Sequence, residues 1–312
     1  MTLSNPYTPL NRGAGAAVLT LALATGYTTR PALAHDITDA VLTARSANCA
    51  DYVAANTATV SDVQNQRTFE AEVTVTSSGG TCRIESNAIP NHDFNATGRF
   101  HTPTQESAQS YSITASPRAA AQPTPLSLEY DNAIFLNGVK LDMMAAGCFG
   151  VGDGRIGCND MSAPYRYDPL GPGGQFGADE HNAHTQPDGT YHYHGNPMAL
   201  FDQDDASRPS PVIGFAADGF PIFGSFIRDG STIRRVRTSY QLRAGLRAGG
   251  PGRTHDGTFI DDWVYVPGSG DLDQCNGMVQ DGVYGYVVTE AYPHVMGCFT
   301  GTPDSSFRKS RP

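Results

Sequence analysis

The stretch DEHNAHTQPDGTYHYHGNP, residues 179–197, holds four of the nine histidines of the chain. Tyrosine and histidine alternate over residues 191–194, and a strand places successive side chains on opposite faces. We therefore expect a strand with His192 and His194 on one face and both tyrosines on the other. A Pro-Asp-Gly sequence at 187–189 lies just before it and predicts a turn.

A second pair of histidines, His181 and His184, lies on the other side of that turn. Their spacing suits one side of a helical turn or a tight loop, and a chain reversal would bring the two pairs face to face. Neutral imidazole is a common ligand of zinc and copper. We predict that these two residues bind zinc or copper together with His192 and His194. The alternative is a hydrogen-bonded histidine network without metal.

Two further positions are candidates for the same site. His92 and Asp93 lie in a polar break between expected strands, where they form either part of a metal site or a hydrogen-bonded turn. Asp273 lies beside a cysteine in the sequence DLDQCNG. Near the histidines it would act as an oxygen ligand, as a partner to an imidazole or as a general base. The alternative is a local turn ordered by a neighbouring disulfide.

Four sequence motifs follow one another along the chain: DGTYHYHGNP at 188–197, VIGFAADGFPIFG at 212–224, DLDQCNG at 271–277 and EAYPHVMGCFTG at 290–301. In these motifs and their order the chain resembles the YHYH-domain family, and the resemblance runs from about Cys49 to Pro303. The resemblance implies an exported protein, and the family has similar motifs at the positions of His92 and Asp273. It implies no particular reaction.

The first residues have the pattern of a secretory signal. Arg12 precedes a short apolar run at 13–26, and Ala32-Leu33-Ala34 fits the small-x-small cleavage rule. We predict a signal peptide at 1–34. No later apolar run reaches the ~18 residues that a membrane-spanning helix needs. The mature chain is expected to be secreted, periplasmic or on the cell surface, with no integral membrane segment.

The net charge of the chain indicates which classes of partner it can bind. The net charge is −10, and an acidic protein is a poor match for the phosphates of nucleic acid. We expect no nucleic acid partner and leave open a small molecule or a surface ligand. Lysine occurs only at Lys140 and Lys309, so a catalytic lysine is not expected.

The cysteines agree with export. Six cysteines in an exported chain predict three disulfides, and there is no Cys-x-x-Cys pair for a thiolate zinc site. Their order along the chain favours Cys49 with Cys82, Cys148 with Cys158, and Cys275 with Cys298.

Short alternating segments dominate the rest of the chain. Strands are expected at Phe69–Thr76, Thr81–Ser86 and Tyr111–Thr114, around Asn137-Gly138, and around Asp218-Gly219. Helical periodicity is limited to Asp36–Ala47 and Tyr240–Ala248. With 34 Gly and 21 Pro, the chain is expected to be mostly β, a sandwich or irregular barrel with long Gly/Pro-rich loops.

The sequence divides into regions by composition. We expect an N-terminal β region at 35–116, a Pro- and Ala-rich linker or crossover at 117–126, the YHYH domain at 127–303 and a C-terminal tail at 304–312.

Two functions from different classes follow. The first is transition-metal binding through the histidines, as a metal-dependent hydrolase or oxidoreductase. The second is a cell-surface binding or carbohydrate-recognition module without metal, in which the histidines, Tyr191, Tyr193 and Trp263 form an open polar and aromatic platform. Convergence of the imidazole nitrogens on one point favours the first function.

Overall fold

The computed structural model describes residues 34–172 and 175–309, so residues 1–33 of the predicted signal peptide lie outside it. The described chain is mostly β, as predicted, and its helical segments are short 3-10 turns. None of the helical segments in the described part of the chain has the length or apolar character needed to cross a membrane.

The first sheet has five strands in sequence order and forms from residues that alternate in burial. They are β1 (His35–Asp36), β2 (Ala54–Asp62), β3 (Arg67–Ser78), β4 (Thr81–Ser86) and β5 (Gln109–Thr114). In β3, Phe69, Ala71, Val73 and Val75 are buried, while the residues that alternate with them are more exposed. This alternation is the period of two that predicted the strand.

The second sheet has eight strands in the order β17-β18-β12-β11-β7-β8-β10-β9. Its strands are β7 (Ala133–Phe135), β8 (Lys140–Leu141), β9 (Ala183–Thr185), β10 (Tyr191–Tyr193), β11 (Val212–Ala216), β12 (Pro221–Phe223), β17 (Gly277–Gln280) and β18 (Val283–Val287). Its central strands are buried along their whole length. Such strands are covered on both faces, which explains their continuous apolar sequence.

Smaller pairs complete the architecture. They are β13 (Phe226–Asp229) with β14 (Thr232–Arg235), β15 (Tyr240–Leu242) with β16 (Trp263–Tyr265), and β6 (Thr124–Pro125) with β19 (Cys298–Phe299). The 3-10 turns are η1 (Cys49–Tyr52), η2 (Ile260–Asp262) and η3 (Ser305–Phe307). Strand β6 lies in the segment predicted as linker or crossover, and η3 lies in the predicted tail.

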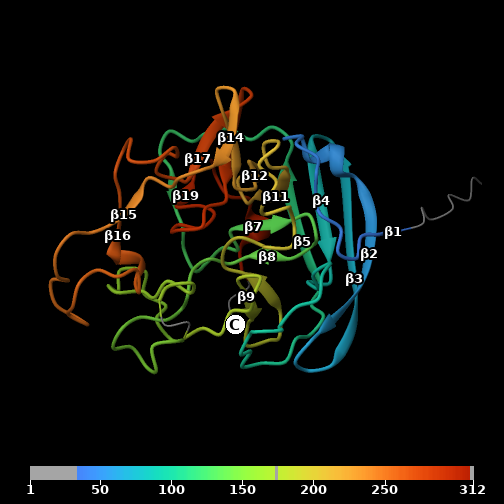
Figure 1. The fold of residues 1–312 in the computed structure, drawn as a ribbon. Helices are drawn as coiled ribbons and strands as arrows, with labels where there is room; N and C mark the ends of the chain where they lie inside the picture. The colour runs from blue at the N-terminus through green and yellow to red at the C-terminus, as the bar shows by residue number, and fades with distance from the viewer. Residues whose placement is uncertain (1–33, 173–174, 310–312) are drawn as a thin grey trace, which may run out of the picture. The chain divides into compact units, whose positions relative to one another are not determined.

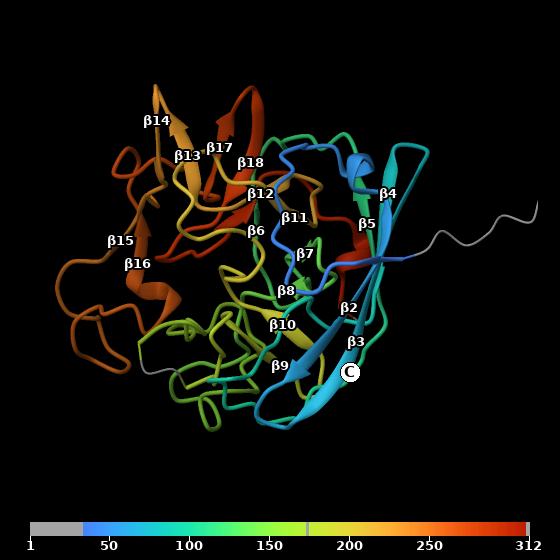
Figure 2. The same cartoon turned by 45° about the vertical axis from the view of Figure 1, so that its right-hand side comes forward.

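The first sheet, blue to teal, lies beside the central strands of the second sheet in both views (Figures 1 and 2). Residues of both sheets, such as Val73 and Phe135, belong to one hydrophobic core. The β7–β8 turn reaches the first sheet at Gly138, where an added methyl would lie 2.7 Å from the Cβ of Ser86. Layered open sheets are therefore observed, and no closed barrel forms among the described residues.

All three predicted disulfides are present: Cys49–Cys82, Cys148–Cys158 and Cys275–Cys298. The two helix predictions are wrong. Asp36 pairs with β2, and Leu42 N donates a hydrogen bond to the Leu200 carbonyl; Tyr240–Leu242 pairs with β16. Pairing with distant segments outweighs the weak local helical periodicity in both cases.

Candidate metal centre

The YHYH strand β10 lies between β8 and β9 in the second sheet. His192 is the ladder partner of His184 on antiparallel β9 and of Lys140 on parallel β8. Paired residues on neighbouring strands project from the same face of a sheet. The ladder therefore places His184 and His192 side by side, and the alternation adds His194 to the same face. The turn before β10 produces the predicted reversal.

The two tyrosines project from the opposite face into the core. Tyr191 and Tyr193 are both 0% exposed, and Tyr193 packs edge-on against Phe135 with ring centroids 5.4 Å apart. The Tyr191 hydroxyl donates a hydrogen bond to Asp179, and the Tyr193 hydroxyl accepts one from Asn137. The predicted open platform that includes these two tyrosines is therefore wrong, because both rings are covered by protein.

His184, His192 and His194 form a cluster that could hold one metal ion. One ring nitrogen of each lies within 4.8 Å of the others. Nε2 of His184 and Nε2 of His194 are 3.0 Å apart. Two nitrogens that share a tetrahedral ion at ~2.0–2.1 Å would lie about 3.4 Å apart, so the spacing needs little adjustment. We call these three residues the histidine triad.

Backbone carbonyls orient two of the rings. Nδ1 of His184 contacts the carbonyl oxygen of Phe176, and Nδ1 of His192 lies 3.4 Å from that of Thr190. A carbonyl oxygen only accepts hydrogen bonds, so each Nδ1 carries the hydrogen and each Nε2 keeps its lone pair. Metal-ligating histidines commonly use their second nitrogen in this way.

The third ring, His194, has a buried Nδ1 without a hydrogen-bond partner. Its Nε2 faces the Nε2 lone pair of His184. A hydrogen on His194 Nε2 would satisfy that contact, but it would leave the lone pair of its buried Nδ1, which has no hydrogen-bond partner, unsatisfied. A metal ion held by these residues would satisfy both Nε2 lone pairs and would allow Nδ1 of His194 to carry the hydrogen.

Burial keeps the triad in the form that binds metal. Burial lowers the pKa of His184, and it lowers the pKa values of His192 and His194 much further, with added repulsion from the neighbouring imidazoles. All three rings are therefore neutral near pH 7. A neutral imidazole is the ligand form, so metal need not displace protons from these rings.

A family model described as "YHYH protein" matches residues 110–301, which is more than half of the chain. The chain belongs to the YHYH family. The comparison with curated proteins found no match, and neither did the comparison with solved structures. In this YHYH protein the matched region contains β7 to β12, the triad and the Cys275–Cys298 disulfide.

Two predicted ligands of this YHYH protein, His181 and His92, lie on the tyrosine side of β10. Nε2 of His92 accepts from the Tyr193 hydroxyl at 2.7 Å, and the rings of His92 and His181 are in tilted contact, with centroids 4.0 Å apart. Asn182 has a left-handed φ of 61°, which turns the chain between His181 and β9. The structure therefore brings together three of the five predicted histidine ligands.

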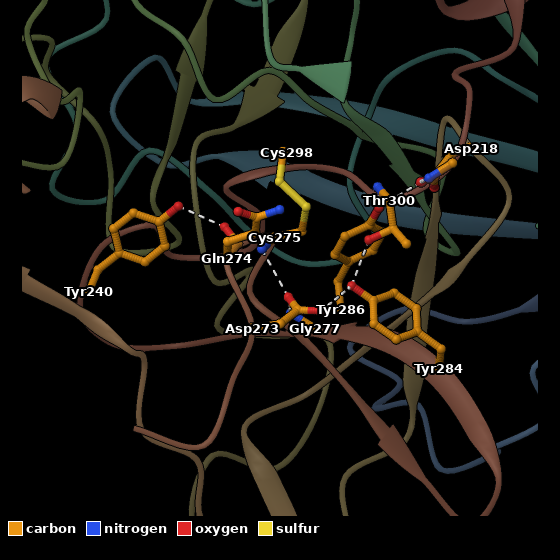
Figure 3. Close-up of a disulfide and its surroundings, with 11 residues drawn as sticks. Asp218, Tyr240, Asp273, Gln274, Cys275, Gly277, Tyr284, Tyr286, Cys298 and Thr300 are labelled. Atoms are coloured by element: carbon orange, nitrogen blue, oxygen red, sulfur yellow. Dashed lines mark hydrogen bonds between the residues drawn. A yellow bond between two sulfur atoms is a disulfide. The ribbon is translucent and has the colours of Figure 1, made fainter. Parts of the chain in front are cut away.

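Asp273, predicted as an oxygen ligand, an imidazole partner or a general base, orders the loop before β17 (Figure 3). Its carboxylate accepts from the backbone N–H groups of Cys275 and Gly277, both at 2.9 Å, and from the Tyr284 hydroxyl at 3.0 Å. It is not part of the triad cluster. Asp273 therefore has the alternative role considered above, in a local turn beside the Cys275–Cys298 disulfide.

Sequence patterns missed the charged residues around the triad. Lys140 is the ladder partner of His192, and Asp142, two residues further on, donates its N–H to the Tyr193 carbonyl. Gln186 Nε2 donates to Asp142 Oδ2 at 2.8 Å. The strands that carry these residues are about 45 residues apart, so only the ladder register could have revealed the cluster.

Proposed function

We propose that this YHYH protein binds one zinc or copper ion through His184, His192 and His194. The observation that supports this most is the convergence of three neutral imidazoles, two of which have Nδ1 directed at a backbone carbonyl. Neutral rings, fixed tautomers and a common centre are the features that metal-ligating histidines share.

Three protein ligands leave one position of a tetrahedral ion available. Catalytic zinc sites have this composition, with water or substrate in the fourth position, whereas structural zinc sites use four protein ligands. Zinc bound there would supply water activation for a hydrolase, and copper would supply one-electron chemistry for an oxidoreductase. The chain itself supplies the orientation of the rings and Asp142, held by Gln186, as a nearby carboxylate.

Export is part of the proposal. Three disulfides join all six cysteines, and disulfides persist in oxidising compartments. Together with the signal sequence predicted at 1–34, they support a secreted, periplasmic or surface location. A metal taken up there would come from outside the cytoplasm.

Metal content by mass spectrometry tests the site. The protein should be exported and purified without a His tag or added metal. We expect about one zinc or copper ion per chain, because three neutral imidazoles share one centre. The same measurement on His192→Ala/His194→Ala should give no bound metal, since one remaining imidazole cannot hold the ion. Circular dichroism would verify that the variant is folded.

A matched control lies on the opposite face of β10. His181→Ala removes an imidazole that is close in sequence but outside the triad, and it should leave the metal content unchanged. No metal in the wild-type protein, even after incubation with zinc or copper, would refute the proposal. Equal metal loss in His181→Ala would show that the ligand set is wrong.

A further inference from the structure

Both lysines of the chain lie in one cluster with two aspartates, and only Lys309 is partly exposed. Lys140 and Asp131 are 6% and 5% exposed, and Asp142 is equally buried. Asp131 lies just before β7 and Lys140 lies in β8, so the β7–β8 hairpin brings them together. Lysine is almost never fully buried unless it is paired, and Asp131 is the partner of Lys140.

The ammonium group of Lys140 faces the whole carboxyl group of Asp131. Nζ lies 3.2 Å from Oδ1 and 3.4 Å from Oδ2. Oδ2 accepts a hydrogen bond from the buried Tyr111 hydroxyl at 2.8 Å, whereas Oδ1 has no hydrogen-bond partner. A well-formed buried ion pair would satisfy both oxygens, whereas Oδ1 has only two ammonium groups near it, Lys140 Nζ at 3.2 Å and Lys309 Nζ at 3.9 Å.

A charge held away from water is costly, and both side chains of this pair are buried. Burial raises the pKa of the Asp131 carboxyl, against the opposing effect of Lys140. Transfer of one proton from the ammonium to the carboxylate removes both charges from the low-dielectric interior. The products are a neutral amine and a carboxylic acid held in contact. A desolvated lysine amine is a nucleophile, and fixed contact replaces an encounter in solution.

We propose that Lys140 and Asp131 are joined by an intramolecular isopeptide bond that forms in the folded protein. Lys140 Nζ forms a bond to Asp131 Cγ, and the bond from Cγ to Oδ1 breaks. Two of the three ammonium hydrogens leave with Oδ1 as one water molecule, and the third stays on the amide nitrogen. Oδ2 becomes the amide oxygen, with Tyr111 as its hydrogen-bond donor. No oxidant, reductant or other reactant is needed.

The remaining charges stay balanced after this reaction. Lys309 Nζ lies 2.5 Å from Asp142 Oδ2, so the second lysine and the second aspartate form their own pair. Loss of the Lys140 and Asp131 charges therefore leaves no uncompensated ion in the cluster. The bond would fix β8 to the start of β7. It would thereby hold the strand whose Lys140 is the ladder partner of His192.

Intact mass spectrometry of the exported, fully reduced and denatured protein tests the bond. The wild-type chain is expected to be lighter than its sequence mass by one water, about 18 Da, because amide formation releases water. Lys140→Arg keeps the positive charge but cannot form this bond, and it should have its full sequence mass. Lys309→Arg, which changes the only other lysine, should keep the deficit.

Peptide mapping would locate the bond, since trypsin cannot cleave after a lysine whose amine is acylated. The expected product is one uncleaved peptide, residues 119–155, in which Asp131 and Lys140 close an internal loop and whose mass is one water below that of its sequence. A full sequence mass for the wild-type chain would overturn the proposal, and so would a deficit that persists in Lys140→Arg. These measurements need no metal, so they are independent of the outcome for the triad.

Discussion

Replacing Tyr193 by alanine is expected to lower the free energy of unfolding by about 3–5 kcal/mol, the usual cost of removing a large aromatic side chain from a core. Tyr193 is fully buried, and its ring packs against Phe135. The loss would also remove the hydroxyl that links Asn137 to His92. Urea denaturation at pH 7.5, in the presence of a chelator, would measure the difference from the wild-type protein.

Tyr193→Phe separates packing from hydrogen bonding. It keeps the ring but leaves Asn137 Nδ2 and His92 Nε2 without the hydroxyl that they share, which should cost about 1–3 kcal/mol. A Tyr193→Phe protein as stable as the wild type would show that the buried network contributes nothing. If Tyr193→Ala were equally stable, the ring would not be in the core as described.

Local patterns predicted the elements that have a clear period or a specific turn. The alternation at Phe69–Thr76 lies within β3, and Thr81–Ser86 coincides with β4. Asn137-Gly138 forms the turn between β7 and β8, with Gly138 in a left-handed conformation at φ 84°. These signals depend only on neighbours in sequence, so a single sequence is sufficient to find them.

Elements that depend on distant partners were not predictable in this way. Strand β2 has the sequence AANTATVSD, which is rich in residues with weak strand preference, and it was not predicted. Its ladder with β3 runs from Ala54 to Asp62 and supplies the stability that local preference does not. The failed helix at Tyr240–Ala248 has the same cause, because β15 forms by pairing with β16.

The candidate site shows the same division. The alternation of residues 191–194 predicts which face each side chain takes, and the turn at 187–189 predicts that His184 returns to that face. The position of His181 depends on the backbone conformation of Asn182, for which the sequence carries no strong signal. Lys309 and Asp142 meet at 2.5 Å across 167 residues, and no local period could reveal that contact.

Acidification is expected to destabilise the apoprotein through its buried histidines. Burial, with repulsion from His181, lowers the pKa of His92 to about 3 in the folded chain, while the unfolded chain keeps a value near 6.5. Below about pH 6.5, His92 therefore binds a proton in the unfolded state but not in the folded state, and stability falls as pH falls. From pH 7.5 to pH 5, His92 alone should account for a loss of about 2 kcal/mol.

His92→Gln isolates this contribution. Glutamine keeps a donor for the Asp93 carbonyl and an acceptor for the Tyr193 hydroxyl, the two partners of the imidazole, but it does not titrate. The buried triad lowers stability in acid in both proteins, and the carboxyls of Asp179 and Asp218, whose pKa values are raised by burial, have the opposite effect in both.

The pH dependence of the wild-type protein, measured by urea denaturation with a chelator present, should therefore be steeper than that of His92→Gln by about 2 kcal/mol over this interval. Parallel curves would mean that His92 takes up its proton in the folded state. That result would require an accessible ring, with the contact to His181 and the hydrogen bond to Tyr193 broken in acid.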